Sequence, residues 1–321
     1  MTTAVLSAPE SVAPRATSVG ILQAIGKTPL IEIDFRDELP GDTKILAKLE
    51  SVNPGGSIKD RPVAQMITQA LAAGHIHAHE SGRRLLDSSS GNAGIAYAQL
   101  GAALGVGVTL VVPANASRER LERIAAYGAE LVLTDPIEGY DHAVHTARRM
   151  AEKNPDRFWY SNQYANEDNW RAHFDGTGVE ILEQVQAETG ASPDAFVGGV
   201  GTGGTLTGIG RRLRRETPDV HIAAVVPEIF PGIEGLKPLG SPGDLVPEIL
   251  DEALIDRRVE VTIDEAVAMS RRLAKQGLYV GPSSGAYVHL ALQVALEDGK
   301  KRVVTILNDT GERYGSTGMW G

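Results

Sequence analysis

Short apolar runs alternate along most of the chain with longer segments that carry apolar residues at helical spacing. The short runs are rich in β-branched residues and mostly unbroken, which is typical of strands buried on both faces of a parallel sheet. We expect strands at residues 44–50, 83–88, 106–113, 129–135, 157–163, 193–200, 220–227, 258–263 and 301–308. We expect helices at residues 61–74, 92–105, 117–128, 140–153, 177–190 and 264–277. This order predicts repeated β-α-β units and an α/β fold with mostly parallel, doubly wound sheets.

The length of 321 residues exceeds what one ordinary hydrophobic core accommodates, so we expect two α/β domains, with one large domain as the alternative. In doubly wound sheets, ligands bind at the carboxyl ends of the strands, in the turns that open the next helix. Four such turns have unusual glycine and hydroxyl content, and they span residues 53–61, 88–94, 198–208 and 281–286.

The composition narrows the class of partner. A formal charge of −10 gives an acidic surface that would repel nucleic acid and anionic lipid, so a small-molecule partner is favoured. The absence of cysteine excludes disulfides, thiolate metal sites and a cysteine nucleophile, and it fits a reducing cytosol. No apolar run approaches the ~18 residues of a transmembrane helix. Residues 1–17 have neither a basic start nor a useful hydrophobic region, so we expect a flexible tail and not a signal peptide.

The loop GGVGTGGTLTG, residues 198–208, follows an apolar strand and precedes a helix. Its glycines allow backbone N–H groups to turn inward, its threonines add hydroxyls, and the helix N-terminus adds partial positive charge, so the loop is suited to phosphate. It is not a P-loop, because no Gly-Lys-Ser/Thr sequence follows. The residues expected to bind phosphate are Gly201, Thr202, Gly203, Gly204 and Thr205.

The same loop also fits the G-x-G-x-x-G pattern of dinucleotide-binding folds, with Glu228 at roughly the distance of a ribose-binding acid. A dinucleotide-binding oxidoreductase is therefore an alternative of another class. Against it, Pro227 interrupts the strand end before Glu228, and the other glycine-rich loops would have no function.

Lys59 follows the sequence NPGGS at the expected start of a helix. Its positive charge opposes the helix dipole there, so its amine is biased toward the neutral form. A neutral amine attacks an aldehyde to form a Schiff base. The alternative interpretation is a solvated surface lysine, as most lysines are.

Two further loops carry serines at helix starts. Residues 88–94, SSSGNAG, offer hydroxyls and backbone donors that suit a carboxylate, and Asn92 offers an amide to a second polar group. Residues 281–286, GPSSGA, offer the hydroxyls of Ser283 and Ser284. A simple helix N-cap is the alternative for both loops.

Together the loops offer an amine for an aldehyde, a cradle for phosphate, a nest for a carboxylate and a hydroxyl for a ring nitrogen. Pyridoxal 5'-phosphate presents the aldehyde, the phosphate and the nitrogen, and an amino acid presents the carboxylate. The chain resembles the fold-type II pyridoxal-phosphate enzymes of the cysteine synthase (O-acetylserine sulfhydrylase) and cystathionine β-synthase family. The resemblance extends from AIGKTPLIEI near the start to NDTGERYGST near the end, which is nearly the whole chain.

This resemblance implies a role for each matching residue. Lys59 matches the family's Schiff-base lysine, Asn92 matches the asparagine that hydrogen-bonds the ring hydroxyl, and Ser283 matches the residue that faces the pyridine nitrogen. Residues 201–205 match the phosphate loop. The residues that match the substrate-binding set are Ser89, Ser90, Gly91, Ala93, Gln163 and Gly235. No metal is implied.

The resemblance also implies a β-replacement reaction. A serine cannot hold the pyridine nitrogen protonated by charge, so loss of a β-leaving group is favoured over a long-lived carbanion. The substrate displaces Lys59, the freed amine removes the α-proton, the β-group leaves, and a nucleophile adds to the bound aminoacrylate. The expected reaction converts O-acetyl-L-serine and sulfide to L-cysteine. O-phosphoserine or serine as the donor stays open, as do thiosulfate, a carrier thiocarboxylate, homocysteine (as in cystathionine β-synthase) or an amine as the nucleophile.

Two other functions fit the sequence less well. The amino-acid dehydratases of this fold carry Lys-x-Arg-Gly-Ala, whereas this chain reads Lys-Asp-Arg-Pro from Lys59. A catalytically silent binding module would leave Lys59 without a role.

The domain division and the setting are likewise implied by the resemblance. A smaller, mobile N-terminal domain is expected to contain residues 1–30 and 53–160, and a C-terminal domain with the phosphate loop to contain residues 31–52 and 161–321. The active site is expected in the cleft between them. The expected form is a cytoplasmic homodimer without a nucleic-acid or membrane partner.

Some positions depart from the family's common pattern. Ala93 replaces a threonine in the carboxylate loop, Lys27 replaces an asparagine, and Val226 stands where a glutamate is usual before proline. Lys237 lies in residues 231–240, PGIEGLKPLG, which match a mobile loop at the mouth of the site. A cation there could pair with a phosphoryl leaving group, so O-phosphoserine is the main alternative to O-acetylserine as the donor substrate. A solvated loop lysine is the alternative.

Overall fold

The computed structural model describes residues 5–6, 17–78, 82–238 and 246–321. The chain divides into two compact units: unit 1 contains residues 1–25 and 59–168, and unit 2 contains residues 26–58 and 169–321. The boundaries that we expected after residues 30, 52 and 160 therefore fall after residues 25, 58 and 168. Most of the expected tail, residues 1–17, lies outside the described residues.

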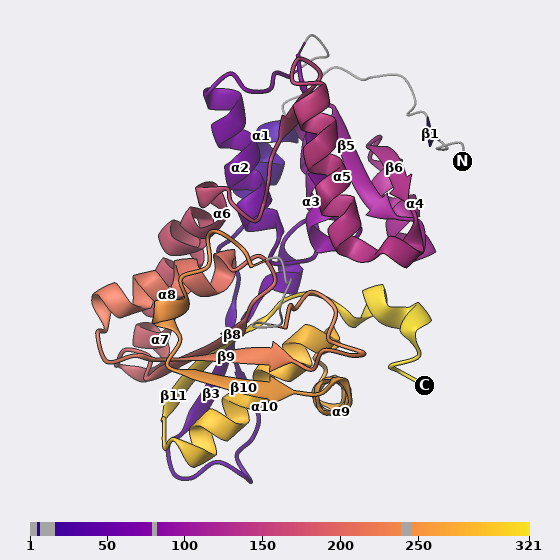
Figure 1. Cartoon of the computed structure of the whole chain (residues 1–321). Helices are drawn as coiled ribbons and strands as arrows, with labels where there is room; N and C mark the ends of the chain where they lie inside the picture. Colours follow the sequence, from indigo (N-terminus) through magenta and orange to yellow (C-terminus); the bar gives the residue numbers. More distant parts are fainter. Residues whose placement is uncertain (1–4, 7–16, 79–81, 239–245) are drawn as a thin grey trace. The chain divides into compact units, whose positions relative to one another are not determined.

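Unit 1 is built on a sheet with the strand order β1-β6-β5-β4-β7. Figure 1 labels β1, β5 and β6 of this sheet. All of its strand pairs are parallel except the pair of β1 with β6. Its elements are β1 (Val5–Leu6), α1 (Thr17–Gln23), α2 (Asp60–Ala72), β4 (Arg84–Ser88), α3 (Asn92–Leu104), β5 (Val108–Pro113), α4 (Arg118–Ala126), β6 (Glu130–Thr134), α5 (Gly139–Lys153) and β7 (Phe158–Tyr160). Helix α6 (Glu167–Ala172) contains the boundary with unit 2.

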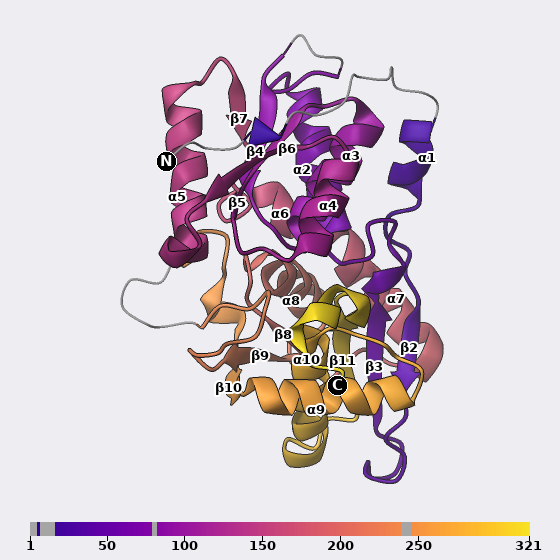
Figure 2. The same ribbon diagram turned by 90° about the vertical axis from the view of Figure 1, so that its right-hand side faces the viewer.

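The unit 1 sheet is covered by helices on both faces. Leu85 and Leu110 pack with α2, α3 and α4, whereas the next residues in the chain, Leu86 and Val111, pack with α5. Successive side chains of a strand point to opposite faces, so the unbroken apolar runs of β4 and β5 supply both layers. Figure 2 shows α2, α3 and α4 on one side of this sheet and α5 on the other.

Unit 2 is built on a sheet with the strand order β10-β9-β8-β11-β3-β2, in which only β2 runs antiparallel to its neighbour. Its elements are β2 (Leu30–Ile33), β3 (Lys44–Leu49), α7 (Gly178–Thr189), β8 (Ala195–Gly199), α8 (Gly204–Glu216), β9 (His221–Pro227), β10 (Arg257–Val261), α9 (Ile263–Lys275), α10 (Pro282–Glu297) and β11 (Arg302–Leu307). Short 3-10 turns span Glu50–Val52, Pro136–Glu138 (in unit 1), Glu252–Leu254 and Gly311–Thr317, and a π-helix spans His173–Thr177.

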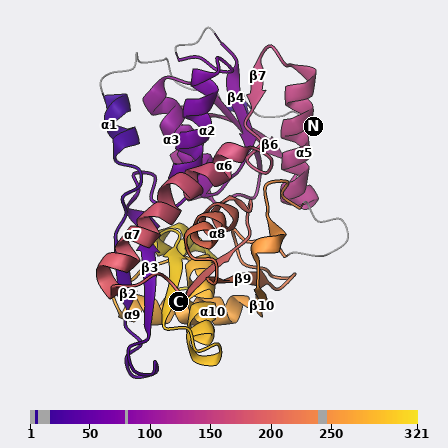
Figure 3. The same cartoon turned by 90° about the vertical axis from the view of Figure 1, so that its left-hand side faces the viewer.

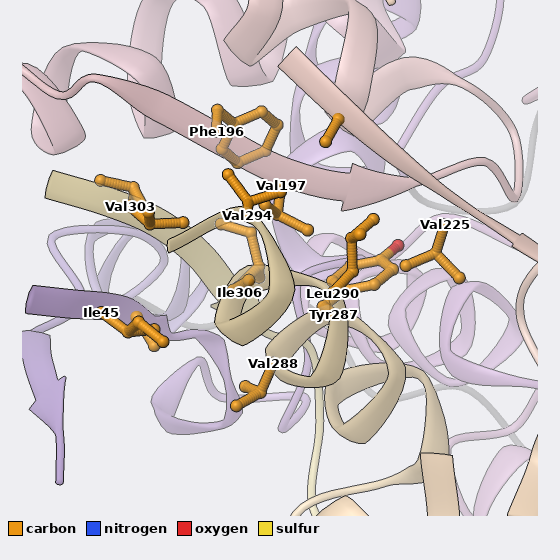
Figure 4. Packing of buried hydrophobic residues seen from close by; sticks show 14 of the residues in the cluster. Ile45, Phe196, Val197, Val225, Tyr287, Val288, Leu290, Val294, Val303 and Ile306 are labelled. Carbon is orange, nitrogen blue, oxygen red and sulfur yellow. The ribbon is translucent and has the colours of Figure 1, made fainter. Parts of the chain in front are cut away.

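Helices α7 and α8 lie on one face of this second sheet, and α9 and α10 lie on the other (Figure 3). Tyr287, Leu290 and Val294 of α10 belong to the same core as Val197 of β8 and Val225 of β9 (Figure 4). Helix α10 is buried along most of its length, which is the pattern of an inner helix and not of a surface one.

The predicted α/β fold with parallel sheets is confirmed, and each of the predicted strands and helices is present. Two strands were not predicted, β1 and β2. Strand β2 has only four residues and lies at the sheet edge, and its exposed Glu32 interrupts the apolar run between Ile31 and Ile33. Strand β7 is limited to three residues, because the chain turns at Asn162, which has a φ of +49° and whose carbonyl oxygen accepts from Ala165 N at 2.9 Å.

Candidate active site

Lys59 occupies the N-cap position of α2 in unit 1, and its carbonyl oxygen accepts a hydrogen bond from Val63 N at 3.2 Å. The side chain is partly exposed. The expectation of a lysine at a helix start is therefore confirmed. At this end of the helix, the positive end of the dipole disfavours an ammonium and favours a neutral amine.

The segment that leads to Lys59 is fixed by Asn53 in unit 2. The Asn53 amide donates to Ser57 O at 3.2 Å and to Glu50 Oε2 at 2.8 Å, and its oxygen accepts from Gly26 N at 2.9 Å. These bonds hold a tight turn in which Gly56 has a φ of +80°, a conformation that a glycine adopts without strain. The NPGGS sequence thus sets where α2 begins.

The predicted carboxylate loop, residues 89–93, opens α3 in unit 1. Gly91 is the N-cap of α3, its N–H donates to Ser89 Oγ at 3.3 Å, and Asn92 is the first helical residue. A Cβ at Gly94 would lie 2.0 Å from Ser89 O, so the close return of the loop onto the helix requires glycine. The first N–H groups of α3 have no partner within the helix, which suits them to an anion.

Gln163 lies beside this loop. Its side-chain Nε2 donates to Ser88 O at 3.1 Å, and its backbone N donates to the Asp87 carboxylate at 3.3 Å. The fold therefore brings together Gln163 and Ser88, residues far apart in the sequence. These bonds place the glutamine next to the serines with which the family resemblance groups it.

The predicted phosphate loop, residues 201–205, opens α8 in unit 2. Gly203 is the N-cap with a φ of +84°, so a side chain there would be strained. A Cβ at Gly201 would lie 2.5 Å from Gly235 O, so Gly201 and Gly235 are close neighbours. The loop presents backbone and hydroxyl donors at a helix N-terminus, as the sequence predicted.

Two residues that the sequence analysis missed hold the hydroxyls of this loop. Asn169 Nδ2 donates to Thr202 Oγ1 at 3.0 Å, and His173 Nε2 lies 3.2 Å from Thr205 Oγ1. Asn169 and His173 are four residues apart, so they lie on one face of a helical segment. The sequence shows this spacing, but it does not show which residues Asn169 and His173 contact.

Ser283 lies in the first turn of α10 and is buried. Its Oγ accepts a hydrogen bond from Asn308 Nδ2 at 3.1 Å, and the neighbouring Ser284 Oγ accepts from Asn308 N at 2.8 Å. Asn308 directly follows β11, which pairs with β8, the strand that leads into the phosphate loop. The residue that hydrogen-bonds Ser283 and the phosphate loop at residues 201–205 therefore follow adjacent strands of one sheet.

Lys237 lies beside the start of the phosphate loop, since its backbone N donates to Val200 O at 2.7 Å. Residues 239 and 240 of the predicted mobile loop lie outside the described residues. Glu228, the acid of the dinucleotide alternative, accepts from Ile263 N at 2.7 Å at the start of α9. Glu228 thus has a structural partner at a helix end, which weighs against a ribose-binding role.

The chain is similar to known proteins over most of its length. The family whose model matches the chain is described as Pyridoxal-phosphate dependent enzyme, and the match covers residues 21–309. A cysteine synthase of Aquifex aeolicus is 44% identical over 308 residues, which cover 94% of this chain and 91% of that protein. The solved structure of an O-ureido-L-serine synthase is 36% identical with a TM-score of 0.83, covering 94% of each chain. A cysteine synthase structure from Entamoeba histolytica is 31% identical with a TM-score of 0.83, covering 98% of this chain and 93% of that one.

None of the helices in the described part of the chain is both long enough and apolar enough to cross a bilayer.

Proposed function

The chain belongs to the family of pyridoxal-phosphate dependent enzymes, and we propose that it is a cysteine synthase. It would replace the β-substituent of an O-activated L-serine, preferably O-acetyl-L-serine, with sulfide to give L-cysteine. The observation that carries this proposal is the 44% identity to the Aquifex aeolicus cysteine synthase across nearly the whole of both chains. The dinucleotide-binding alternative is not favoured.

The residues proposed to bind pyridoxal phosphate fit it in each unit taken by itself. The backbone of the phosphate loop is open to an anion because its glycines carry no side chains, and Gly203 has the left-handed conformation that glycine favours. Thr202 and Thr205 add hydroxyl donors, Lys59 offers an amine, and Ser283 offers a hydroxyl. When bound, the cofactor supplies an aldehyde for an amine and a conjugated ring that withdraws electrons from the substrate.

Lys59 is proposed to hold the cofactor covalently and then to act as the acid and base. Its Nζ would take the α-proton of the bound amino acid and later return a proton to the same carbon. The position at the N-cap of α2 supports this role, because the helix dipole favours the neutral amine that accepts a proton.

Ser283 is proposed to donate a hydrogen bond to the pyridine nitrogen. Its Oγ already accepts from Asn308 Nδ2, so its own O–H proton is left for a further acceptor. A neutral hydroxyl does not hold a positive charge on that nitrogen as a carboxylate would, so departure of a β-group is favoured over other outcomes.

The substrate's carboxylate is proposed to bind the N–H groups of Ser89, Ser90 and Gly91 and the hydroxyls of the two serines, with the amide of Gln163. The start of α3 supports this role, since the first N–H groups of a helix and its dipole both favour an anion. Ala93 supplies a backbone N–H only, because its side chain is a buried methyl group. Asn92 is proposed to bind the ring hydroxyl, and Gly235 to line the substrate's side-chain path.

We also propose that the protein acts as a homodimer in the cytoplasm, as the family resemblance implies. Light scattering after size-exclusion chromatography tests the dimer directly. A single species at the monomer mass, 34.1 kDa, across a range of concentrations would contradict it.

The function is tested by incubating the purified, cofactor-loaded protein with O-acetyl-L-serine and sulfide and by measuring L-cysteine. We expect cysteine to form with the wild type and with Lys153→Ala, a matched variant of an exposed lysine in unit 1. We expect Lys59→Ala to keep its fold, to lose the visible absorbance of the lysine-bound cofactor and to form no cysteine. A normal absorbance band in Lys59→Ala would refute the assignment of Lys59, and absence of cysteine with every donor and sulfide would refute the function.

A further inference from the structure

Asp87 is fully buried in unit 1, directly before the carboxylate loop. Its carboxylate accepts three hydrogen bonds: from Ser88 N at 2.7 Å, from the Tyr97 hydroxyl at 2.9 Å and from Gln163 N at 3.3 Å. These donors come from the end of β4, from α3 and from the segment after β7. Asp87 thus connects the end of β4 and the helix that follows it, α3, to Gln163, which lies 76 residues farther along the chain.

Two of these neighbours of Asp87, Ser88 and Gln163, are also hydrogen-bonded to each other. Ser88 O accepts from Gln163 Nε2 at 3.1 Å and from the Tyr140 hydroxyl at 2.6 Å. Asp87, Ser88 and Gln163 therefore form a closed ring of hydrogen bonds. Ser88 is the last residue before the loop at 89–91, and Gln163 is proposed to bind the same ligand, so this ring sets the position of one relative to the other.

The titratable groups that face Asp87 are tyrosines. Tyr97 on α3, Tyr140 on α5, Tyr160 on β7 and Tyr164 after β7 all have their pKa raised by burial and, to a smaller extent, by the negative charge of Asp87. All four are therefore neutral at physiological pH. Two charged residues of α5 also shift these pKa values. Asp141 raises the pKa of Tyr140 and of Tyr164, and Arg148 lowers the pKa of Tyr160. Helix α2 contributes the thioether of Met66 to this region, and its sulfur lies 3.8 Å from the Tyr97 hydroxyl.

Asp87 titrates within an accessible range of pH. Burial raises the pKa of its carboxyl to about 6, and the hydrogen bonds from Ser88, Tyr97 and Gln163 oppose that rise. A carboxylate that accepts three bonds is a different partner from a carboxylic acid, which must donate one. The network therefore has two states within the pH range in which enzymes are assayed.

The hydroxyl chain beside Asp87 accommodates both states. With Asp87 ionised, Tyr97 donates to it and can accept from Ser161 Oγ, which lies 2.9 Å away. With Asp87 protonated, the carboxyl donates to Tyr97, and Tyr97 then donates to Ser161. The oxygen that carries the proton is the one that accepts from Gln163 N, so protonation weakens the hold on Gln163.

We propose that Asp87 is a positioning residue for the carboxylate site, and that only its ionised form holds Ser88 and Gln163 in the arrangement that binds an amino-acid substrate. The inference rests on the proposed function in one respect, the assignment of residues 89–91 and Gln163 to the substrate's carboxylate. Because Asp87 is fully buried, the role proposed for it is indirect, through those two neighbours.

The test compares wild type with Asp87→Asn, Tyr97→Phe and the matched variant Asp135→Asn, which changes an exposed aspartate of unit 1. The probe is L-alanine, which has an amino-acid carboxylate and no leaving group, titrated from pH 5 to pH 8 by the visible absorbance of the cofactor. Because ionisation of the ligand and of the cofactor is common to all four proteins, differences between their pH profiles report the protein network.

We expect the dissociation constant of wild type to rise up to tenfold per pH unit below about pH 6, as for loss of one required ionisation. Asp87→Asn should bind about tenfold more weakly at pH 7.5 and lack this acid limb. Its amide would put a donor opposite either Ser88 N–H or Gln163 N–H. Tyr97→Phe should move the limb upward by about one pH unit, because the ionised carboxylate loses a donor. Asp135→Asn should follow wild type.

A second readout does not need the cofactor. The ¹³C carboxyl resonance of Asp87, in cofactor-free protein labelled at aspartate, should titrate near pH 6 and at higher pH in Tyr97→Phe. This measurement also keeps the proposal testable if Asp87→Asn fails to fold.

Three outcomes would overturn the inference: an Asp87→Asn profile identical to wild type, an acid limb that does not move in Tyr97→Phe, or tighter L-alanine binding below pH 6. The last would mean that repulsion between two carboxylates outweighs positioning. Failure of the proposed function is distinguishable, because a protein that forms no cysteine can still show the titration of Asp87 and its shift in Tyr97→Phe.

Discussion

Gly204 and Asn169 approach so closely that a Cβ on the glycine would lie 2.0 Å from Asn169 Oδ1. Asn169 in turn donates to Thr202 Oγ1. The missing side chain at the first residue of α8 thus allows the asparagine to hold a hydroxyl of the phosphate loop. The glycine-rich sequence of this loop has two roles, since it opens the backbone to an anion and admits a neighbouring side chain.

This contact predicts that Gly204→Ala displaces Asn169 and weakens cofactor binding. We expect the dissociation constant for pyridoxal phosphate to rise about tenfold, which corresponds to the ~1–2 kcal/mol of one lost hydrogen bond and its rearrangement. The control is Gly210→Ala on the same helix, where the atoms nearest the new Cβ would be the Cδ1 atoms of Ile222 and Leu254, both at 3.2 Å. Equilibrium dialysis measures both variants, and equal affinities would show that Asn169 does not support the loop.

The buried carboxyl of Asp87 predicts a specific dependence of stability on pH. Its pKa is raised in the folded protein from 3.8 to about 6, so between these values the folded state binds more protons than the unfolded state. The contribution of Asp87 to stability is therefore greatest below pH 4 and is lost as the pH rises to 6. The loss between pH 4 and pH 7 is about 2 kcal/mol, from 1.36 kcal/mol per pKa unit.

Denaturant unfolding of wild type and Asp87→Asn at pH 4, 5, 6 and 7 checks this sign. The free energy of unfolding of Asp87→Asn, relative to wild type, should increase by about 2 kcal/mol over the range. Subtracting the two proteins removes the contribution of the other carboxylates. A constant difference between them would mean that Asp87 does not titrate with a raised pKa.

Two lysines of strand β3 predict losses of stability of very different size for the same substitution. Lys48 is fully buried, and its Nζ donates to Glu180 at 2.7 Å, to Gln184 at 2.8 Å and to Thr28 O at 2.6 Å. Removing one partner of a buried ion pair leaves the other charge uncompensated, so Lys48→Met should lower the free energy of unfolding by ~3–5 kcal/mol.

Lys44 is the matched control on the same face of the same strand. It pairs with Glu32 at 2.7 Å and with Glu188 at 3.1 Å, but its side chain and theirs are all at least 31% exposed. Lys44→Met should therefore cost less than ~1 kcal/mol. Urea denaturation of both variants decides the matter, and similar losses would indicate that the Lys48 pair is as solvated as the Lys44 pair.

Local features of the sequence predicted most of the fold and the candidate loops. Strands β4, β5 and β8 are recognisable from their unbroken apolar runs. The loops after β4 and β8 are recognisable from their glycine and hydroxyl content. Both signals lie within short stretches of sequence. Lys59 was found because an amine at a helix start is out of place electrostatically.

Partners of buried polar groups were not predictable in the same way. Asp87 meets Tyr97 and Gln163, and Thr205 meets His173, only after strands and helices distant in the sequence have packed. A sequence pattern identifies a polar residue at a strand end, but the donors that satisfy it depend on register and packing. For the same reason the sequence alone leaves a ribose-binding role open for Glu228. The hydrogen bond that Glu228 accepts from Ile263 N, which only the structure shows, weighs against that role.

Lys237 gives the prediction that bears on the leaving group. Its backbone N–H is bound to Val200 O, so the residue is fixed beside the start of the phosphate loop in unit 2, and its side chain is partly buried. A point charge there would favour a phosphoryl leaving group over an acetyl group, although a partly solvated pair contributes only ~0–1 kcal/mol, or up to about fivefold in rate. We therefore expect Lys237→Ala to change kcat/KM by less than fivefold with both O-acetyl-L-serine and O-phospho-L-serine, with sulfide as the nucleophile. Lys275→Ala, an exposed lysine of α9, controls for the loss of one positive charge. If Lys237→Ala lowers kcat/KM for O-phospho-L-serine more than fivefold and leaves O-acetyl-L-serine unchanged, with the difference persisting at high salt, then O-phosphoserine is the donor that this site selects.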